Sequence, residues 1–441
     1  MTEDFLHFLW YNQLYRDDAY LSCGTKFHVI NPGVPNRDAG PDFFNAKIEI
    51  GNKIWVGNVE IHIQASDWYR HNHHLDSSYD NVILHVVAHN DRLVKCKSGV
   101  EISSFEIHPD ASVLNLYQSL TDNSLAQQCG NYFSKISSME RLSVFTSAFV
   151  ERIEKKIKHR SEIRKPEPDF TQIGFLYLFR AFGMKVNAEP FEMLASKLNY
   201  RILLRYAWNI ELLEALIFGQ AGMLHKPWKD AYMKHIASEY FFLKEKHRLA
   251  PMQSHLWKFM RIRPAGFPTV RMAQLAALFN SNPSIIGSWL SCDSLSAVKK
   301  ALSFHMSDYW KNHYNFGKEL VRRNNQPGKY FQDSLIINAF VPVMFEYSAL
   351  SGSYDYIERA IAILEELSPE NNYIIRKWKE LGVYPENAMQ SQALIHIYNA
   401  FCSQGECIHC PLGRKFLFKQ IDSYEDKRKS RKRQTQGKAH E

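Results

Sequence analysis

The chain has 441 residues, of which 45% are hydrophobic and 23% charged. This composition is typical of a soluble globular protein of two or three domains, and it excludes disordered, collagen-like and coiled-coil chains. No apolar run approaches the ~18 residues that cross a bilayer, and the chain opens with Glu3 and Asp4 instead of a basic signal sequence. We therefore expect a cytoplasmic protein that makes no membrane contact.

The formal net charge of +8 is shared between two parts of the chain. Residues 423–441 carry seven Lys or Arg against three acidic residues, a net charge of +4. We expect this segment to be a solvated, disordered basic tail. The remaining +4 makes the body mildly basic, which permits DNA or RNA as a partner without requiring either.

The first part of the chain predicts a β-rich domain over residues 1–110. A helix is expected over 3–16, and β-branched and aromatic runs with period-2 alternation follow it. The Gly51–Asn52–Lys53 turn should pair Ile50 with Ile54 in an antiparallel hairpin. The predicted strands cover 27–31, 44–50, 54–64, 82–88 and 102–107.

From residue 111 onward the pattern becomes helical. Leu142, Phe145 and Phe149 illustrate the spacing, since apolar residues recur three or four positions apart. Breaks are expected at 165–168, 263–268 and 282–283, where Pro and Gly gather. The fold class is therefore α+β: an N-terminal mixed β-sheet domain followed by a large all-helical domain over 111–422, which could itself be two units.

The densest group of polar residues with potential catalytic or metal-binding roles lies in the predicted sheet. Glu60, His62 and Gln64 share one face of their strand, because residues two apart project together, while Val59 and Ile61 face the core. Upstream, the apolar positions are Ile54 and Val56, so the alternation of apolar and polar residues reverses between Val56 and Val59. This reversal predicts a β-bulge at Gly57. Counting back from the hairpin places Asp42 opposite His62, or one residue away once the bulge is included.

Asp42, Glu60 and His62 can then converge on one metal ion. Two carboxylates and an imidazole suit Mg²⁺, Mn²⁺ or Zn²⁺, and we favour Mg²⁺ or Mn²⁺ at the carboxylates. Such an ion activates water for phosphodiester hydrolysis. The alternative is an Asp-containing turn beside hydrogen-bonded surface residues.

This arrangement resembles the PD-(D/E)-x-K nuclease superfamily, in which an Asp opens one strand and Glu-x-Lys lies on the next, antiparallel strand. Pro41–Asp42 and Glu60–Ile61–His62 match, except that His62 stands in place of the Lys. The resemblance implies a restriction-endonuclease-like sheet and a metal-dependent nuclease. Because the Lys is expected to position the attacking water, His62 could be a ligand or a base, or the site could be inactive.

Further candidates follow the Glu60 strand. Six histidines occupy residues 62–89, and a loop with His71, His73 and Asp76 could supply more ligands or a general acid or base. Asp67 and His71 are the candidates that we place with the catalytic residues. We interpret His85, which lies in an apolar strand, as a core residue.

Several longer segments together carry a resemblance to a known family. They are NRDAGPDF (36–43), GNVEIH (57–62), SDW (66–68), YDNVILHVV (79–87), RPAGFPTVR (263–271) and the C-terminal cysteines. These segments are similar to the bacterial domain-of-unknown-function family numbered 2851. The resemblance covers nearly the whole chain, and it implies little about activity because the family is named for its unknown function.

Those cysteines form a Cys-x4-Cys-x2-Cys cluster at Cys402, Cys407 and Cys410. Seven cysteines in the chain are too few for a disulfide scaffold. Three soft ligands this close predict Zn²⁺ or an iron–sulfur cluster, each of which needs a fourth ligand. The family resemblance implies Cys129, with His409 and Cys23 as alternatives. Ordinary reduced thiols are the other interpretation.

Arg263 and Arg271 frame a Pro/Gly loop with interleaved aromatic residues, a composition that can hold phosphates and stack bases. The alternative is a rigid helix–helix connection whose aromatic side chains belong to the core.

The sequence leaves two candidate functions. One is a metal-dependent nuclease or phosphodiesterase that acts on nucleic acid. The other is a non-catalytic factor that binds nucleic acid or protein on a degenerate nuclease-like scaffold.

Overall fold

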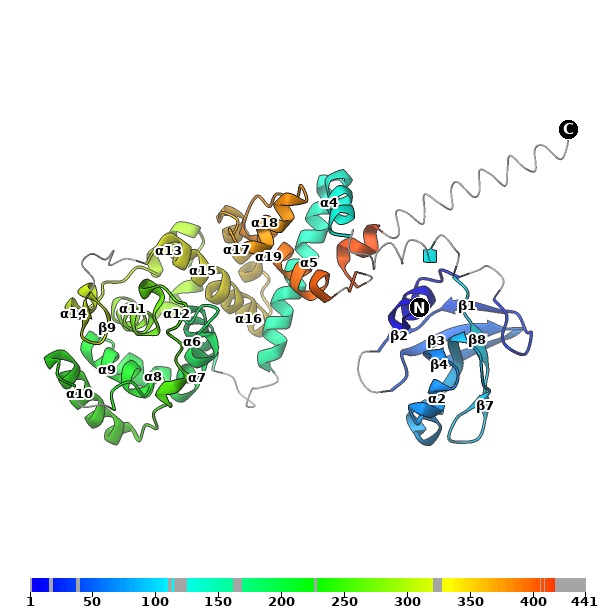
Figure 1. The fold of residues 1–441 in the computed structure, drawn as a ribbon, viewed down its shortest axis with the longest axis horizontal. Coiled ribbons are helices and arrows are strands. Elements are labelled where there is room, and N and C mark those ends of the chain that lie inside the picture. Colours follow the sequence, from blue (N-terminus) through cyan, green and yellow to red (C-terminus); the bar gives the residue numbers. More distant parts are fainter. Residues whose placement is uncertain are drawn as a thin grey trace. The chain divides into compact units, whose positions relative to one another are not determined.

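The chain divides into two compact units, each described here by itself. Unit 1 comprises Met1–Ser137, Leu381–Val383 and Ile397–Glu441, and unit 2 comprises Ser138–Glu380 and Tyr384–His396. Figure 1 shows their elements in a computed structural model. The predicted basic tail at 423–441 lies outside the described residues. The structure describes residues 2–15, 19–36, 40–109, 113–114, 125–161, 169–225, 228–319, 327–404, 406–407 and 409–416.

Unit 1 contains a mixed six-stranded sheet in the order β1-β3-β4-β5-β8, with β2 added beside β3. The first three strands of that order pair antiparallel, whereas β4–β5 and β5–β8 are parallel. The α+β class with an N-terminal mixed sheet is therefore confirmed. The strands are β1 (Phe27–Asn31), β2 (Val34–Pro35), β3 (Phe43–Ile50), β4 (Lys53–Gln64), β5 (Val82–His89) and β8 (Ser104–Glu106), with β6 (Val94–Lys95) and β7 (Glu101–Ile102) in a separate ribbon.

The β3–β4 hairpin differs from the prediction by one residue. Ile50 pairs with Lys53, so Glu49 and not Ile50 faces Ile54. The connection is a two-residue turn, in which Gly51 takes the positive φ that such hairpins favour at their first position.

The predicted bulge also lies elsewhere. Phe43 pairs with Val59 and Ala46 with Gly57, so the extra residue is in β3, where Asn45 has a positive φ. Extending this register brings Asp42 level with Glu60 and not with His62. The shorter turn and the bulge on the opposite strand together account for the shift.

One helix covers the sheet near this hairpin. α1 (Glu3–Tyr11) begins after Thr2, whose side chain accepts a hydrogen bond from the Phe5 amide. It ends earlier than the predicted residue 16, and it packs against β4 and β5. Its buried face consists of Phe5, Leu6, Phe8, Leu9 and Trp10.

Unit 2 is helical, and the helical part of the predicted fold is confirmed with one addition. The hairpin β9 (His313–Asn315) and β10 (Lys318–Glu319) lies within it, which the sequence did not predict. The helices are α5 (Ser138–Ser161), α6 (Phe170–Phe182), α7 (Ala188–Lys197), α8 (Tyr200–Arg205), α9 (Ile210–Gln220), α10 (Ala231–His247), α11 (Pro268–Ser281), α12 (Ile285–Trp289), α13 (Leu295–Ala301), α14 (Asp308–Asn312), α15 (Lys329–Leu335), α16 (Val341–Ser351), α17 (Asp355–Glu366), α18 (Tyr373–Glu380) and α19 (Ala388–Ala400), whose residues from Ile397 onward belong to unit 1.

The predicted helical stripe on α5 is largely correct, since Phe145 and Phe149 are buried, but Leu142 is exposed. Two of the predicted breaks also occur, because α11 begins at Pro268 and ends at Ser281. The third, at 165–168, lies outside the described residues.

One helix in the described residues, Lys329–Ser351, is long and apolar enough to cross a membrane. The sequence analysis found no such span, because polar residues such as Asn338 interrupt the apolar run. A core helix passes the same test, and 67% of the apolar window is buried inside the protein. A π-helical turn at Ile336–Phe340 precedes Pro342, which has no amide hydrogen to donate.

Candidate metal centre

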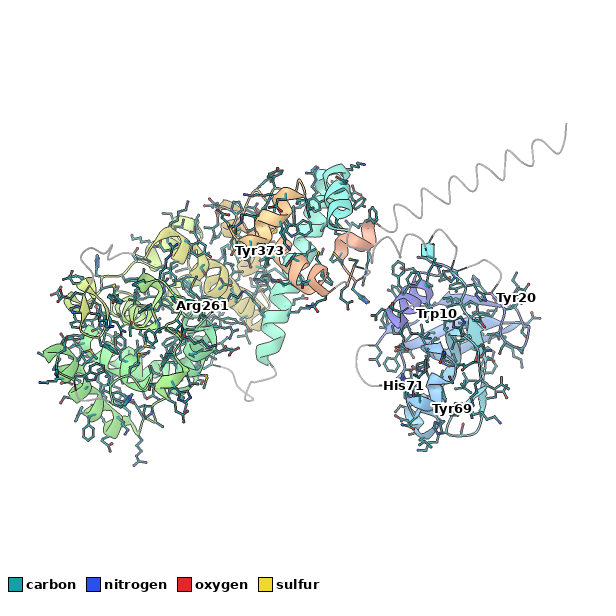
Figure 2. The ribbon with its side chains drawn as sticks, viewed as in Figure 1. Trp10, Tyr20, Tyr69, His71, Arg261 and Tyr373 are labelled. Carbon is teal, nitrogen blue, oxygen red and sulfur yellow. The ribbon has the colours of Figure 1, made fainter. Side chains whose placement is uncertain are left out.

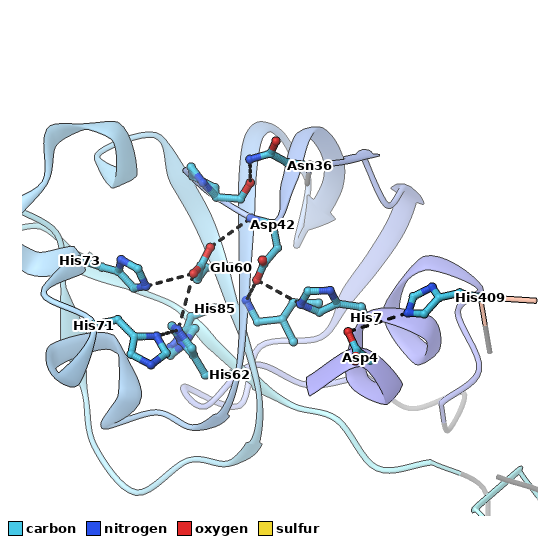
Figure 3. Close-up of polar contacts among 12 residues, drawn as sticks. Asp4, His7, Asn36, Asp42, Glu60, His62, His71, His73, His85 and His409 are labelled. Atoms are coloured by element: carbon cyan, nitrogen blue, oxygen red, sulfur yellow. Dashed lines mark hydrogen bonds and ion pairs between the residues drawn. The ribbon is translucent and has the colours of Figure 1, made fainter. Parts of the chain in front are cut away.

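Asp42 and Glu60 lie side by side where β3 begins. The Asp42 amide donates a hydrogen bond of 3.1 Å to Glu60 Oε2, and the Ile61 amide donates one of 2.9 Å to Asp42 Oδ2. Each carboxylate is therefore held by a backbone amide from the other strand (Figure 3). This reciprocal contact keeps both side chains in fixed positions, as a preformed binding site requires.

Three imidazoles gather around Glu60. His73 Nε2 lies 3.2 Å and His62 Nε2 3.6 Å from Glu60 Oε1. His62 Nε2 also lies 3.2 Å from His71 Nδ1. One nitrogen from each of these histidines lies within 4.8 Å of the others, a spacing that fits a shared metal ion. We call Asp42, Glu60, His62, His71 and His73 the carboxylate–histidine cluster.

The crossover between β4 and β5 brings the two loop histidines to the strand. His71 follows α2 (Asp67–Arg70), and His73 opens a short 3-10 turn, His73–Leu75. Between them Asn72 adopts a left-handed backbone conformation, which Asn tolerates better than most residues and which reverses the chain. The His73 ring stacks on Tyr79 with a centroid distance of 3.9 Å. Figure 2 shows His71 beside Tyr69 at this end of unit 1.

Burial sets the protonation of the inner residues. Glu60 is 4% exposed and His62 1%. Burial, followed by the charge of Asp42, holds the pKa of Glu60 well above its usual range. Burial, followed by the nearby His85 and His73 rings, lowers the pKa of His62 to about 2. His62 is therefore neutral at physiological pH, which is the form of imidazole that binds a metal.

His85 supports His62 from the neighbouring strand. His62 Nδ1 lies 2.9 Å from His85 Nε2, and His85 is fully buried. Burial lowers the pKa of His85 to about 3, so both rings are neutral and one must donate to the other. When His62 Nδ1 donates, its Nε2 carries a free lone pair directed toward Glu60 and His71, as in metal-ligating histidines.

Two further histidines, His85 and His7, contact the cluster, although the sequence predicts a core role for His85 and no role for His7. His7, on α1, places Nε2 3.3 Å from Asp42 Oδ2. Burial opposes protonation of His7, but the hydrogen bond and charge of Asp42 outweigh it, and the pKa of His7 is raised. No local signal marks His7, since its partner lies far away along the chain. For His85, the sequence offered one signal of a role in the site, namely a polar residue inside an otherwise apolar strand.

Asp67 lies outside the carboxylate–histidine cluster by its contacts. Its carboxylate accepts a hydrogen bond of 3.1 Å from the Gln64 amide and pairs with Arg70. Both partners are near neighbours of Asp67 along the chain. These contacts stabilise the start of α2, where an acidic residue also suits the helix dipole.

The predicted cysteine ligands all lie in unit 1. Burial raises the pKa of Cys129 to about 12, and the nearby Cys410 and Cys407 contribute to the increase. Burial of the thiol also raises the pKa of Cys402, with further contributions from the other three. The alternative ligand Cys23 is exposed and hydrogen-bonds with Thr25. His409 lies 3.5 Å from Glu406 Oε2.

The two predicted nucleic-acid residues belong to unit 2 and differ in environment. Arg263 directly precedes the short 3-10 turn Pro264–Gly266. Arg271 instead stacks on the Phe331 ring at 3.4 Å and donates to Gln274. Trp257 is buried and donates to the Ala221 carbonyl. The packing around Arg271 and Trp257 is that of a helix–helix connection.

Comparison with known proteins identifies one family. The family described as "Protein of unknown function (DUF2851)" matches residues 3–373. This range includes the carboxylate–histidine cluster and most of unit 2, and it ends before Cys402. No curated protein and no solved structure matches the chain. Because the match covers most of the sequence, the chain belongs to the DUF2851 family of proteins of unknown function.

Proposed function

We propose that unit 1 is a metal-dependent phosphodiesterase that cleaves nucleic acid. The supporting observation is the convergence of Asp42, Glu60 and His62 with two further histidines. Asp42 directly precedes one strand, and Glu60 lies on the next, antiparallel strand. The PD-(D/E)-x-K resemblance implies this arrangement, which supports a restriction-endonuclease-like identity for the sheet.

The carboxylate–histidine cluster fits a divalent metal ion. His73 Nε2 is buried without a hydrogen-bond partner, although it lies 3.2 Å from Glu60 Oε1. A buried polar atom in this state is costly unless a ligand satisfies it. Imidazole nitrogens suit transition metals better than Mg²⁺, so the three histidines favour Zn²⁺ or Mn²⁺ over Mg²⁺ at the carboxylates. When bound, such an ion lowers the pKa of a coordinated water and polarises a phosphoryl oxygen.

His62 acts as a ligand in this proposal, and not as the base. A buried imidazole with a pKa of about 2 binds protons too weakly to accept one from water near neutral pH. It also lacks the positive charge of the Lys that the resemblance implies at this position. His71 is the exposed histidine of the cluster, so it is the one that solvent reaches.

The test is cleavage of labelled single-stranded and double-stranded DNA and RNA by the full chain with Mn²⁺, Zn²⁺ or Mg²⁺. Glu60→Gln and Asp42→Asn should each lower the rate by at least about 100-fold, since even residues that only support metal ligands account for roughly 10–100-fold. Glu49→Gln is the matched control, because Glu49 is an exposed carboxylate on β3.

Three outcomes separate the alternatives. Activity that falls with Glu60→Gln and persists with Glu49→Gln supports the enzyme. Unchanged cleavage by Glu60→Gln would place the activity elsewhere. Nucleic-acid binding without cleavage under any metal would favour the non-catalytic factor on a degenerate scaffold.

A further inference from the structure

Four of the seven cysteines belong to two segments of unit 1 that lie far apart along the chain. Cys402, Cys407 and Cys410 belong to the C-terminal segment, whereas Cys129 lies on α4 (Leu125–Lys135). All of unit 2 lies between Cys129 and the nearest of the three along the chain. Any approach of Cys129 to the other three thiols therefore depends on the fold and not on sequence proximity.

A tight turn holds two of the C-terminal thiols. The Cys410 amide donates to the Cys407 carbonyl at 3.2 Å, and the His409 amide donates to the Glu406 carbonyl at 3.2 Å. The helical residues 411–416 follow at once. A Cβ on Gly413 would overlap the Cys407 carbonyl oxygen, so only glycine allows this close approach.

Residues directly after Cys129 anchor α4 against neighbouring parts of unit 1. The Tyr132 ring packs edge-on against Phe416, with a centroid distance of 5.1 Å. A Cβ on Gly130 would overlap the Leu381 carbonyl oxygen, which shows how closely the backbones meet. Gly130 adjoins Cys129, so these contacts position its thiol relative to the C-terminal turn.

The environment of the four thiols suits a soft cation. Cys410 is buried, Cys129 and Cys407 are half-buried, and Cys402 is the exposed member. A metal ion binds the deprotonated form of a thiol, so metal binding would release protons from these cysteines and the cation would offset the repulsion among the thiolates.

We propose that Cys129, Cys402, Cys407 and Cys410 form a four-thiolate site for one soft metal centre, either Zn²⁺ or an iron–sulfur cluster. Both take four thiolate ligands, and the Cys-x4-Cys-x2-Cys spacing occurs in iron–sulfur proteins while Cys-x2-Cys occurs in zinc sites. Thiolates do not favour Mg²⁺ or Ca²⁺. The centre would join α4 to the C-terminal segment and close a long loop, which stabilises the folded state. This site shares no residue with the carboxylate–histidine cluster.

The test uses the full chain purified anaerobically, with metals and acid-labile sulfide quantified. Wild type should hold about one equivalent of zinc, or iron with sulfide and a visible absorption band, at this site. Cys407→Ser and Cys129→Ser should lose that equivalent. Cys23→Ser and Cys292→Ser should keep it, because Cys23 is exposed and Cys292 lies in unit 2. Glu60→Gln should also keep it, which separates this metal from one at the carboxylate–histidine cluster.

If the Ser variants do not fold, two further measurements still test the proposal. Cys407→His keeps a nitrogen ligand and should retain zinc, since Cys₃His sites are common. In wild type, a chelator should raise the number of thiols that react with a thiol reagent by about four, one per ligand of such a site. Metal-free protein after reconstitution with zinc and with iron plus sulfide would overturn the proposal. So would disulfides among the four cysteines, or full metal retention by Cys129→Ser.

Discussion

A histidine at position 62 changes the chemistry that a lysine would supply there. His62 is buried, hydrogen-bonded to His85 and neutral, so its ring nitrogen offers a lone pair where a lysine would offer a positive charge. Histidines at 71 and 73 extend the same preference for nitrogen ligands. The site is therefore more suited to a transition metal than a pair of carboxylates alone would be.

Glu214 gives a prediction at the residue scale that does not depend on the candidate metal centre. It lies fully buried on α9, where Ser307 donates to Oε1 at 2.7 Å and Tyr232 donates to Oε2. Burial raises the pKa of Glu214 well above its usual value of 4.5. The folded chain then keeps a proton that the unfolded chain loses, so stability is complete below pH 4.5 and falls as pH rises toward the folded pKa.

We expect Glu214→Gln to remove this pH dependence. The free energy of unfolding of the variant relative to wild type should rise between pH 5 and pH 8, by up to about 1.4 kcal/mol per pH unit. Urea denaturation at several pH values measures it. Glu245→Gln, an exposed carboxylate on α10, serves as the control. Parallel stability curves for Glu214→Gln and wild type would show that Glu214 is ionised in the folded chain.

At the scale of elements, the register of three strands decides which polar residues meet. The bulge at Asn45 and the short Gly51–Asn52 turn bring Asp42 level with Glu60. The parallel β4–β5 pairing sets Glu60 opposite His85. A slip of one residue in either pair would turn these side chains to the opposite face.

Gly57 is a position where β4 and β5 approach closely. A Cβ there would overlap Ile83 Cγ2 and would lie 2.7 Å from the Asn81 carbonyl oxygen. Gly57→Ala should therefore lower the free energy of unfolding by about 1–3 kcal/mol through overpacking. Gly287→Ala on α12 meets nothing within 4 Å and should stabilise by up to about 1 kcal/mol. Denaturation of both variants tests this, and a Gly57→Ala protein as stable as wild type would contradict it.

At the scale of the molecule, unit 1 draws on both ends of the chain while unit 2 lies between them in the sequence. The sequence-based division placed its boundary at residue 110 and kept α4 and the cysteines with the helical domain. The contacts of Tyr132 with Phe416 and of Gly130 with Leu381 instead join α4 to the C-terminal part of the chain within unit 1.

This discontinuity predicts unequal behaviour of fragments. A fragment of residues 138–396 should fold with a cooperative thermal transition, since it contains all of unit 2. A fragment of residues 1–137 should be less stable than one in which a linker joins 1–137 to 397–416, because it lacks the partner of α4. Circular dichroism during heating measures both. Equal stability of the last two fragments would show that the C-terminal segment contributes nothing to unit 1.

Local pattern in the sequence was enough for the class of fold and for part of the site. Period-2 alternation predicted the main strands, three-to-four spacing predicted the helices, and a shared strand face brought Glu60 and His62 together. These signals depend on neighbours along the chain, so one sequence suffices to read them. The prediction that Asp42 lies near them also followed from the hairpin, although its exact partner did not.

Only the tertiary structure decided the rest. His7 reaches Asp42 from another element, and His85 meets His62 through a parallel pair that needs a crossover. The helix that carries Cys129 packs through Tyr132 against Phe416 from the opposite end of the chain. The bulge lies in β3 and not at Gly57, where it was predicted, because the pairing of the backbones sets the strand register and the alternation of apolar residues alone does not. Contacts between residues far apart along the chain depend on how elements pack, and no local periodicity encodes that packing.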